Sequence, residues 1–245
     1  MSKLVIKFPT RNRPDKFFFT LQKYIRLLSG KHEVQFIITM DSDDQTMNNP
    51  KIHKQFQDLS DIIKTNNISW LSLNWFYGES KTKIEAVNAN MENIKGDVLL
   101  LASDDMMPYE SEYDSVIFNC FSQRFADFDG AIKFWDGLRE KNDPLMTLCV
   151  MGFPLYKKFG YIYNPEYTSL FCDTEQTEVC IQLNKFSMNK ECIIAHQWSP
   201  QAWDELHARN ENAQMYSKDK EVYGRRKKNN FDIESMLSVD NTIKS

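Results

Sequence analysis

Apolar, β-prone runs alternate with segments of helical periodicity over the first hundred residues of this chain. Four short runs rich in Val, Ile and Leu predict strands, and the three segments between them place apolar residues at helical spacing. The predicted strands cover residues 3–8, 34–40, 69–73 and 97–102, and the predicted helices cover residues 15–28, 52–65 and 80–94. Such alternation is typical of βαβ units, which build a parallel sheet covered by helices on both faces. We therefore expect an α/β fold with a mostly parallel central sheet.

The remainder of the chain has a less regular pattern. Its apolar spacing predicts helices, one helical turn and three further strands. The helices are expected at residues 111–125 and 173–183, the turn at 154–159, and the strands at 130–135, 145–151 and 192–195. Residues 203–230 are polar and are expected to be helical in part. The sequence therefore predicts a C-terminal helical extension behind the sheet domain.

Composition excludes several classes of protein. The net charge of −4 disfavours broad electrostatic binding to nucleic acid. Only 8 glycines are present and none forms a glycine-rich phosphate loop, which disfavours kinases, GTPases and dehydrogenases. The 5 cysteines contain no CxxC pair, so we expect buried free thiols in a reducing compartment. No apolar run reaches the roughly 18 residues that a membrane span needs, and the N-terminus lacks a signal-peptide layout. We expect a soluble, cytoplasmic protein.

Unusual polar residues follow the predicted strands. Asp104 and Asp105 come directly after the apolar run at residues 98–101. Ligands of open α/β sheets bind beyond the carboxyl ends of the strands, and carboxylates there suit Mg²⁺ or Mn²⁺. The alternative is an acidic turn that caps the next helix, and this segment alone leaves both interpretations open.

Several segments, taken in order, resemble GT-A glycosyltransferases, especially their large inverting family. Residues 99–108 resemble the Asp-x-Asp metal region, which is followed by proline, and residues 8–14 resemble the opening Pro-Thr-x-x-Arg-Pro loop that lies against the nucleotide. Residues 40–44 match the Asp-rich loop that contacts the base, and residues 78–88 match the Gly-x-x-x-Ala-x-Asn helix before the metal strand. The resemblance covers residues 3–108 well and extends more loosely to about residue 200.

The resemblance implies a GT-A fold and a division of labour along the chain. Residues 1–200 would form the catalytic domain, with a nucleotide-sugar half at 1–108, an acceptor half at 109–200 and a helical extension at 201–245. Basic residues on the extension can fold over the donor phosphates, although a solvated surface is the alternative for the run that begins at Arg225. The expected donor-binding residues are Pro9, Thr10, Arg11, Arg13, Asp41, Asp43, Lys81, Lys83, Ser103, Arg225 and Arg226.

The metal motif departs from the family pattern at one position. Ala102 stands where the family usually has its first aspartate, so Asp104 keeps the last carboxylate of the motif. Asp105 can compensate, and His196 is a candidate third ligand because some GT-A enzymes use a late histidine. The alternative for His196 is a histidine at a strand end with a satisfied hydrogen bond. Asp104, Asp105 and His196 are therefore the expected ligands of Mn²⁺ or Mg²⁺.

An inverting transferase also needs a base that takes the proton of the acceptor hydroxyl. Asp173 and Glu175 resemble the acidic acceptor-side motif that opens a helix in the family, with Asp173 the preferred base. The alternative is an N-cap and an acidic first turn. Trp135, Trp198 and Trp203 are candidates for stacking on a sugar or base, or for the core.

We therefore expect a metal-dependent glycosyltransferase that moves a sugar from a nucleoside-diphosphate sugar, with UDP the expected nucleotide, to an acceptor hydroxyl with inversion. The acceptor is a glycan or, because the Lys- and Asn-rich composition fits an AT-rich viral genome, a hydroxymethylated DNA base of a phage. A viral enzyme would act in the host cytoplasm. The alternatives are a non-catalytic binding module, motivated by Ala102, a sugar nucleotidyltransferase, and a nuclease or phosphatase with a carboxylate cluster.

Overall fold

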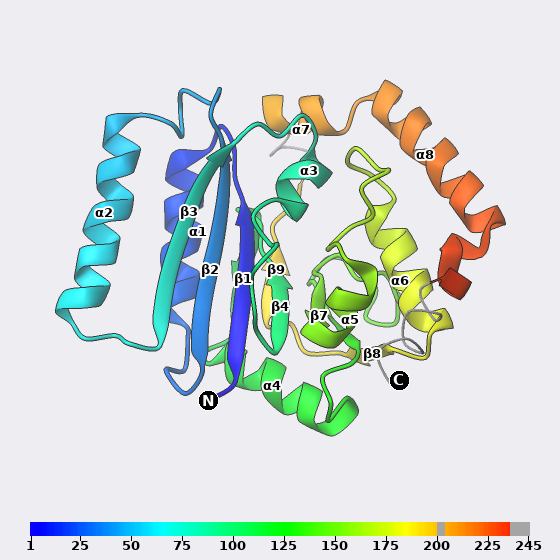
Figure 1. The fold of residues 1–245 in the computed structure, drawn as a ribbon, viewed down its shortest axis with the longest axis horizontal. Helices are drawn as coiled ribbons and strands as arrows, with labels where there is room; N and C mark the ends of the chain where they lie inside the picture. Colours follow the sequence, from blue (N-terminus) through cyan, green and yellow to red (C-terminus); the bar gives the residue numbers. More distant parts are fainter. Residues whose placement is uncertain (200–203, 236–245) are drawn as a thin grey trace.

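The computed structural model describes residues 1–199 and 204–235. A seven-stranded sheet forms the centre of the molecule, in the order β3-β2-β1-β4-β7-β6-β8 (Figure 1). Within this sheet only β7 runs against its neighbours, so the sheet is mostly parallel. The strands are β1 (Lys3–Pro9), β2 (Glu33–Asp41), β3 (Leu71–Gly78), β4 (Val98–Leu101), β6 (Ala131–Phe134), β7 (Val150–Gly152) and β8 (Phe186–Asn189). The α/β fold expected from the sequence is confirmed.

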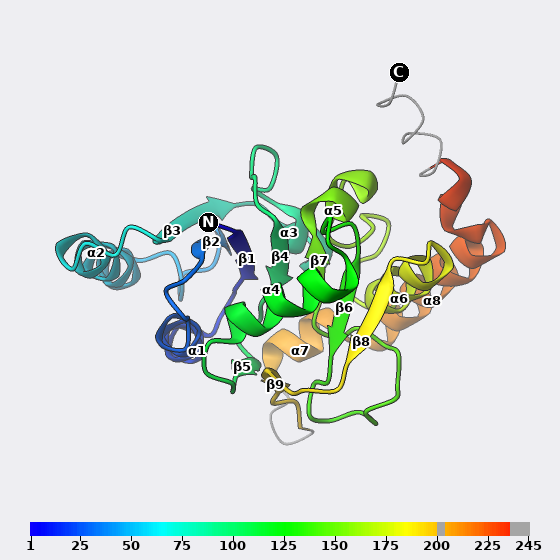
Figure 2. The same ribbon diagram turned by 90° about the horizontal axis from the view of Figure 1, so that it is seen from below.

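Helices cover both faces of the sheet, as Figure 2 shows from below. One face carries α1, α2 and α4, and the other carries α3, α5 and α6. Their bounds are α1 (Pro14–Arg26), α2 (Pro50–Thr65), α3 (Lys83–Asn88), α4 (Tyr113–Arg124), α5 (Phe153–Phe159) and α6 (Cys172–Gln182). A small antiparallel ribbon of β5 (Met106–Pro108) and β9 (Ile194–His196) lies beside the sheet.

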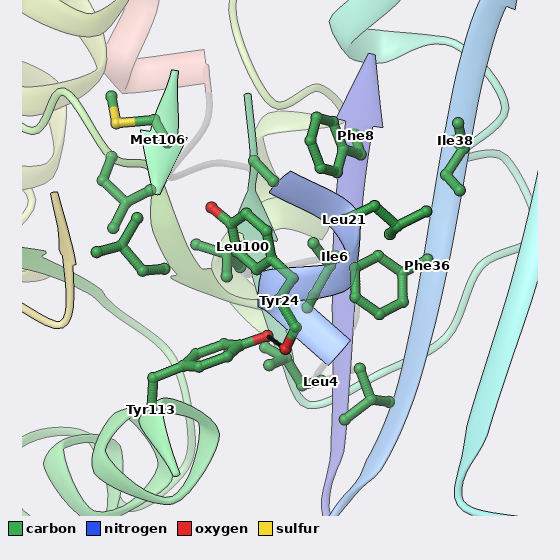
Figure 3. Packing of buried hydrophobic residues seen from close by; sticks show 14 of the residues in the cluster. Leu4, Ile6, Phe8, Leu21, Tyr24, Phe36, Ile38, Leu100, Met106 and Tyr113 are labelled. Carbon is green, nitrogen blue, oxygen red and sulfur yellow. Dashed lines mark hydrogen bonds between the residues drawn. The ribbon is translucent and has the colours of Figure 1, made fainter. Parts of the chain in front are cut away.

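Successive side chains of β1 point to opposite faces of the sheet, so the core consists of two clusters. Leu4, Ile6 and Phe8 point to the α1 face, whereas Val5 points to the α3 face, and all four are fully buried. On the α1 face the Tyr113 hydroxyl donates to the Tyr24 backbone carbonyl at 3.2 Å (Figure 3). Strands buried on both faces read as continuous apolar runs, which is why the strands of the first half were recognisable from sequence.

The chain continues into α7 (Glu205–Asn210), α8 (Ala213–Lys228) and the short helix η2 (Asn230–Asp232). The carboxylate of Asp219 on α8, fully buried, accepts hydrogen bonds from the backbone amides of Thr168, Ser169 and Leu170 at 2.8–2.9 Å. Helix α8 is therefore fastened to the loop before α6. None of the helices among residues 1–199 and 204–235 has the length and hydropathy to cross a membrane.

Several predicted elements differ from the observed ones. The helix expected at 80–94 is only α3, because Thr82 caps its start and the chain turns extended at Ala89. The strand expected at 145–151 is reduced to β7, and β3 extends five residues beyond the predicted end at 73. The sequence pattern missed β5, which has only three residues, and β8, which has four residues and is only partly buried at the edge of the sheet. All five thiols are free, as expected, although Cys120 and Cys192 are only half-buried.

Candidate active site

The carboxyl ends of β1, β2 and β4 meet at one edge of the sheet because these strands are parallel neighbours. The segments that follow them hold most of the polar residues expected to bind donor and metal. Helix α7 lies at the same edge (Figure 1). A site built here draws its residues from four separate parts of the chain.

Arg11 connects the loop after β1 with the loop after β2. Its Nη1 donates to Asp41 Oδ2 at 2.7 Å and to Asp43 Oδ1 at 2.6 Å, and its Nη2 donates to Asp43 Oδ2 at 3.0 Å. The Ser80 backbone amide donates to the other oxygen of Asp41 at 3.1 Å. The hydrogen bond from Arg11 lowers the pKa of Asp43. Arg11, Asp41 and Asp43, expected at the nucleotide, are thus brought together.

The loop that begins at Pro9 holds two buried polar atoms with unmade hydrogen bonds. Thr10 Oγ1 and Arg11 Nε have no hydrogen-bond partner within the described part of the chain. Leaving a buried donor or acceptor unpaired costs about 1–3 kcal/mol. Two such atoms on consecutive residues, beside an Asp-rich loop, fit a surface that completes its hydrogen bonds with a ligand or solvent.

Asp104 is buried against the start of α1. Its Oδ1 accepts from Arg13 Nη1 at 2.9 Å and lies 3.5 Å from Lys16 Nζ. Its backbone carbonyl accepts from the Thr20 hydroxyl at 3.0 Å. Burial raises the pKa of Asp104 above its ordinary value, with Arg13 and Lys16 opposing that effect. The carboxylate therefore faces two cations in the protein itself.

Asp105 points to a different set of partners. Its Oδ2 lies 3.6 Å from His196 Nε2, and its Oδ1 accepts a hydrogen bond from Ser103. The β5–β9 ribbon causes this pairing, because Met106 is in register with His196 and the Gln197 amide donates to the Asp105 carbonyl at 2.7 Å. Burial would raise the pKa of Asp105, but the interactions with His196 and Ser103 together outweigh it and lower the pKa.

These contacts revise which residues fit a metal. Across residues 1–199 and 204–235, no three His, Cys, Asp or Glu side chains gather closely enough to hold an ion. Asp105 and His196 form a pair that offers a carboxylate oxygen and an imidazole nitrogen, a donor set that suits Mn²⁺. Asp104, expected as the main ligand, is engaged by Arg13, and Ala102 is a buried core residue without a donor atom. The pair fits a metal whose remaining ligands come from a diphosphate and water.

Lys83 begins α3, Lys81 lies two residues before it, and the candidate base Asp173 lies at the start of α6. Lys81 and Lys83 are exposed, and the charge of Lys83 contributes to lowering the pKa of Asp105 and opposes the burial-driven rise in the pKa of Cys172. Lys83 is thus in electrostatic reach of both β4 and the start of α6. Asp173, adjacent to Cys172, is partly exposed, and its Oδ1 accepts from the Thr174 amide at 2.8 Å. The N-cap position belongs to Phe171, so Asp173 lies within the first turn.

Glu175 has a different setting from Asp173. It is 3% exposed, and its two oxygens accept hydrogen bonds from Arg226 Nε at 2.8 and 3.0 Å. Tyr167 donates to Oε2 at 2.7 Å and Asn164 to Oε1 at 3.3 Å. A carboxylate so enclosed cannot meet an acceptor hydroxyl. The structure gives Glu175 a role in packing α6 against α8, which corrects its assignment as a second candidate base.

The two arginines expected to fold over the donor phosphates lie elsewhere. Arg225 is paired with Glu166, and Arg226 with Glu175 and Glu166, near the C-terminal end of α8. Figure 1 shows this end of α8 beside α6, away from the carboxyl ends of β1 and β2. These ion pairs correct the assignment of Arg225 and Arg226 to the donor site.

Among the candidate tryptophans Trp135, Trp198 and Trp203, Trp198 lies where a residue that contacts a ligand is expected. It is 40% exposed and lies two residues beyond His196, where the ladder to Asp105 continues through Gln197. Trp135 donates through Nε1 to the Arg139 carbonyl at 2.6 Å and carries Lys141 over its ring. Trp203 lies outside the described residues.

Sequence reasoning missed the residues of α7. Asp204 caps this helix in a capping box with His207, and it also binds Arg13, which is 191 residues earlier in the chain. Arg209 contributes to lowering the pKa of Asp43. Asp204 followed by Glu205 in the first turn is a sequence signal for a helix start. It does not signal a contact with the first loop of the protein.

Comparison with known proteins identifies the fold. No protein-family model matches the sequence, and no curated protein matches it as a relative. Solved structures do match: the mannosyltransferase PcManGT from Pyrobaculum calidifontis, in complex with GDP-Man and Mn²⁺, has a TM-score of 0.62 at 12% identity over 85% of this chain and 60% of its own. S. aureus TarS 1–349 in complex with UDP has a TM-score of 0.57 at 14% identity over 81% of this chain and 61% of its own.

Glucosyl-3-phosphoglycerate synthase from Mycobacterium tuberculosis, in complex with Mg²⁺ and UDP, has a TM-score of 0.53 at 11% identity and matches 89% of this chain and 80% of its own. The chain spans about three fifths of the length of PcManGT and of TarS 1–349. The seven-stranded, mostly parallel sheet flanked by helices and these structural neighbours support the same fold. The chain has the GT-A fold of nucleotide-sugar-dependent glycosyltransferases.

Proposed function

We propose that this protein is a metal-dependent glycosyltransferase that uses a nucleoside-diphosphate sugar, with UDP the expected nucleotide. The observation that supports it most is the pairing of Asp105 with His196 at 3.6 Å, at the edge of a GT-A sheet where Arg11 joins Asp41 and Asp43. The candidate metal pair joins the segment after β4 to the β5–β9 ribbon, and the candidate base-binding loops follow β1 and β2. That arrangement suits a donor whose nucleotide and diphosphate are bound side by side.

Each group has a distinct role in the proposed site. The loop from Pro9 to Arg13 and the carboxylates of Asp41 and Asp43 bind the nucleotide. Asp105 and His196 hold the Mn²⁺ or Mg²⁺, which when bound neutralises the charge that builds on the departing nucleoside diphosphate. Lys83 lies within electrostatic reach of Asp105 and assists with the phosphates.

The transfer itself needs a base on the acceptor side. The acceptor hydroxyl oxygen attacks the anomeric carbon, the bond to the diphosphate oxygen breaks, and the carboxylate of Asp173 takes the hydroxyl proton. A direct displacement of this kind inverts the anomeric centre. Asp173 is partly exposed at the start of α6, so it is accessible to an acceptor, unlike Glu175.

A glycan is the acceptor that the surface favours over a modified DNA base. The basic run expected to contact DNA is largely neutralised, because Arg225, Arg226 and Lys227 are each paired with a glutamate. An exposed Trp198 beyond His196 offers an aromatic face for a sugar ring. Retention on duplex DNA at low salt would reverse this preference.

Nucleotide binding with and without metal tests the proposal. UDP, GDP, CDP and dTDP are titrated calorimetrically into the protein in Mn²⁺ or in EDTA, and hydrolysis of the matching sugar nucleotides is followed. We expect one nucleotide to bind in a metal-dependent manner. Asp105→Asn and His196→Ala should each weaken that binding about 10- to 100-fold, because each change removes a proposed metal ligand or alters it, and losses of this size follow when a metal site is disturbed. Asp58→Asn, an exposed carboxylate on α2, is the matched control.

A non-catalytic binding module is the second candidate, and Ala102 favours it because the position has no carboxylate. It predicts no metal-dependent UDP binding and no hydrolysis of a donor sugar nucleotide. Metal-dependent binding of one of the four nucleotides, with hydrolysis of its sugar nucleotide, would refute this candidate, and absence of both in Mn²⁺ would refute the transferase.

A further inference from the structure

The guanidinium of Arg13 is bound on two sides by carboxylates from distant parts of the chain. Nη1 donates to Asp104 Oδ1 at 2.9 Å. Nε donates to Asp204 Oδ2 at 2.7 Å and Nη2 donates to Asp204 Oδ1 at 2.6 Å. Nη2 also lies 2.8 Å from His207 Nδ1. Nearly all the donors of Arg13 are therefore used within the protein.

The contact with Asp204 has the geometry of anion recognition. Two parallel N–H groups meet two oxygens, which is the bidentate form that arginine also makes with phosphate. The side chain of Arg13 is only 10% exposed, whereas that of Asp204 is 44% exposed. The buried partner belongs to the candidate donor site, and the exposed partner belongs to α7.

We propose that Asp204 occupies on Arg13 the place of a phosphate group of the donor, so that α7 is an internal competitor which the nucleoside diphosphate displaces. The inference rests on the proposed function for the identity of the ligand. Under this proposal Asp204 competes with the ligand for Arg13, a role that goes beyond capping a helix or forming a surface ion pair. The Asp204 carboxylate also accepts from the amides of Leu206 and His207, so releasing Arg13 leaves the capping role of Asp204 intact.

Asp204→Asn tests the proposal because asparagine caps helices as well as aspartate does and removes only the charge. The probes are inorganic pyrophosphate and the nucleoside diphosphate, each titrated in Mn²⁺. If Asp204 competes, the variant should bind both probes about fivefold more tightly, the gain expected from removing one partly exposed ion pair. Glu205→Gln, the next residue of α7, removes the same charge from an exposed position and should leave both affinities unchanged.

Hydrogen exchange gives a second readout. In the wild-type protein the amides of Leu206 to Ala208 should exchange faster when the nucleoside diphosphate is bound, because α7, though still capped by Asp204, loses its contact with Arg13 and therefore opens more often. Unchanged affinities in Asp204→Asn, or weaker binding, would overturn the proposal, the latter because it would show that Asp204 positions Arg13 for the ligand. Slower exchange in the bound protein would overturn it as well.

The failures of the two proposals differ. Tighter pyrophosphate binding by Asp204→Asn, with no binding of any nucleotide by either protein, would refute the proposed transferase function and support the role of Asp204 as a competitor. Metal-dependent nucleotide binding that Asp204→Asn leaves unchanged would support the transferase function and refute the competitor role. Absence of all binding would refute both proposals.

Discussion

Lys7 is a buried amine in the centre of the sheet, and replacing it with methionine should stabilise the protein in a pH-dependent manner. The side chain is fully buried on β1, where Nζ donates to Thr39 Oγ1 and, at 2.6 Å, to the Ala89 carbonyl. Burial lowers its pKa from 10.5 to about 7, with Glu92 opposing that shift. Lys7→Met keeps a similar length and removes the charge.

The direction and magnitude follow from proton linkage. Between about pH 7 and pH 10.5 the unfolded chain holds the proton on Lys7 and the folded protein does not, so stability rises with pH over that window. The slope approaches about 1.4 kcal/mol per pH unit where the two states differ by one proton. From pH 7 to pH 8.5 the wild type should therefore gain about 1.5–2 kcal/mol relative to Lys7→Met.

Urea unfolding of both proteins at pH 6, 7 and 8.5 measures this difference. We expect Lys7→Met to be the more stable protein at pH 6 and 7, and its advantage to shrink by about 1.5–2 kcal/mol at pH 8.5, or about 3–8 °C in Tm. Groups other than Lys7 titrate in both proteins and cancel. Lys54→Met, on the exposed face of α2, should show a difference that does not change with pH. A constant difference for Lys7→Met as well would refute the lowered pKa.

Three further changes test individual residues. Asp173→Asn should reduce transfer by at least about 100-fold while leaving donor affinity unchanged, as loss of a general base does, measured by product formation and calorimetry. Trp198→Ala should raise the KM for a glycan acceptor about fivefold without changing donor binding, because it removes one aromatic contact; an unchanged KM would place the acceptor elsewhere. Glu175→Gln should lower the free energy of unfolding by about 2–4 kcal/mol in urea, because it removes the charge of the buried carboxylate that pairs with the buried Arg226, and equal stability would contradict that role.

Much of the first half of the fold was predictable because β1, β2 and β4 are buried on both faces. Val98–Leu101 and Glu33–Asp41 are apolar over most of their length and lie between segments of helical period. The same reasoning located the carboxyl edge, since parallel strands bring their ends together wherever they occur. Asp41, Asp43 and Arg11 were therefore placed correctly near one another from sequence order alone.

The pairing of individual carboxylates could not be predicted in this way. Asp104 and Asp105 are adjacent in sequence, yet one points to Arg13 on α1 and the other to His196 on β9. Their difference depends on the β5–β9 ribbon, whose strands are three residues each. A strand was expected close to β9, but its partner β5 carries no recognisable pattern. Arg226 presents the same difficulty, because a basic run looks like a solvated surface until Glu175 is found opposite it.

The charges at the carboxyl edge bear on why a metal would be needed for donor binding. Among the described residues, Arg11 and Arg13 are the only arginines whose guanidinium groups contact the carboxylates of this edge, and each arginine already pairs with two of those carboxylates. The carboxylates at the edge are Asp41, Asp43, Asp104, Asp105 and Asp204.

A diphosphate that enters such an edge meets cations that are already paired and a carboxylate, Asp105, whose lowered pKa keeps it ionised. Besides Lys83, two further sources of positive charge can accommodate the ligand: a divalent ion on Asp105 and His196, or an arginine freed from its internal partner. Release of Asp204 from Arg13 provides the second, so Asp204→Asn should reduce the dependence of nucleotide binding on Mn²⁺ as well as tighten it. Binding to that variant that still vanishes in EDTA, as completely as in the wild type, would show that the freed arginine cannot substitute for the ion.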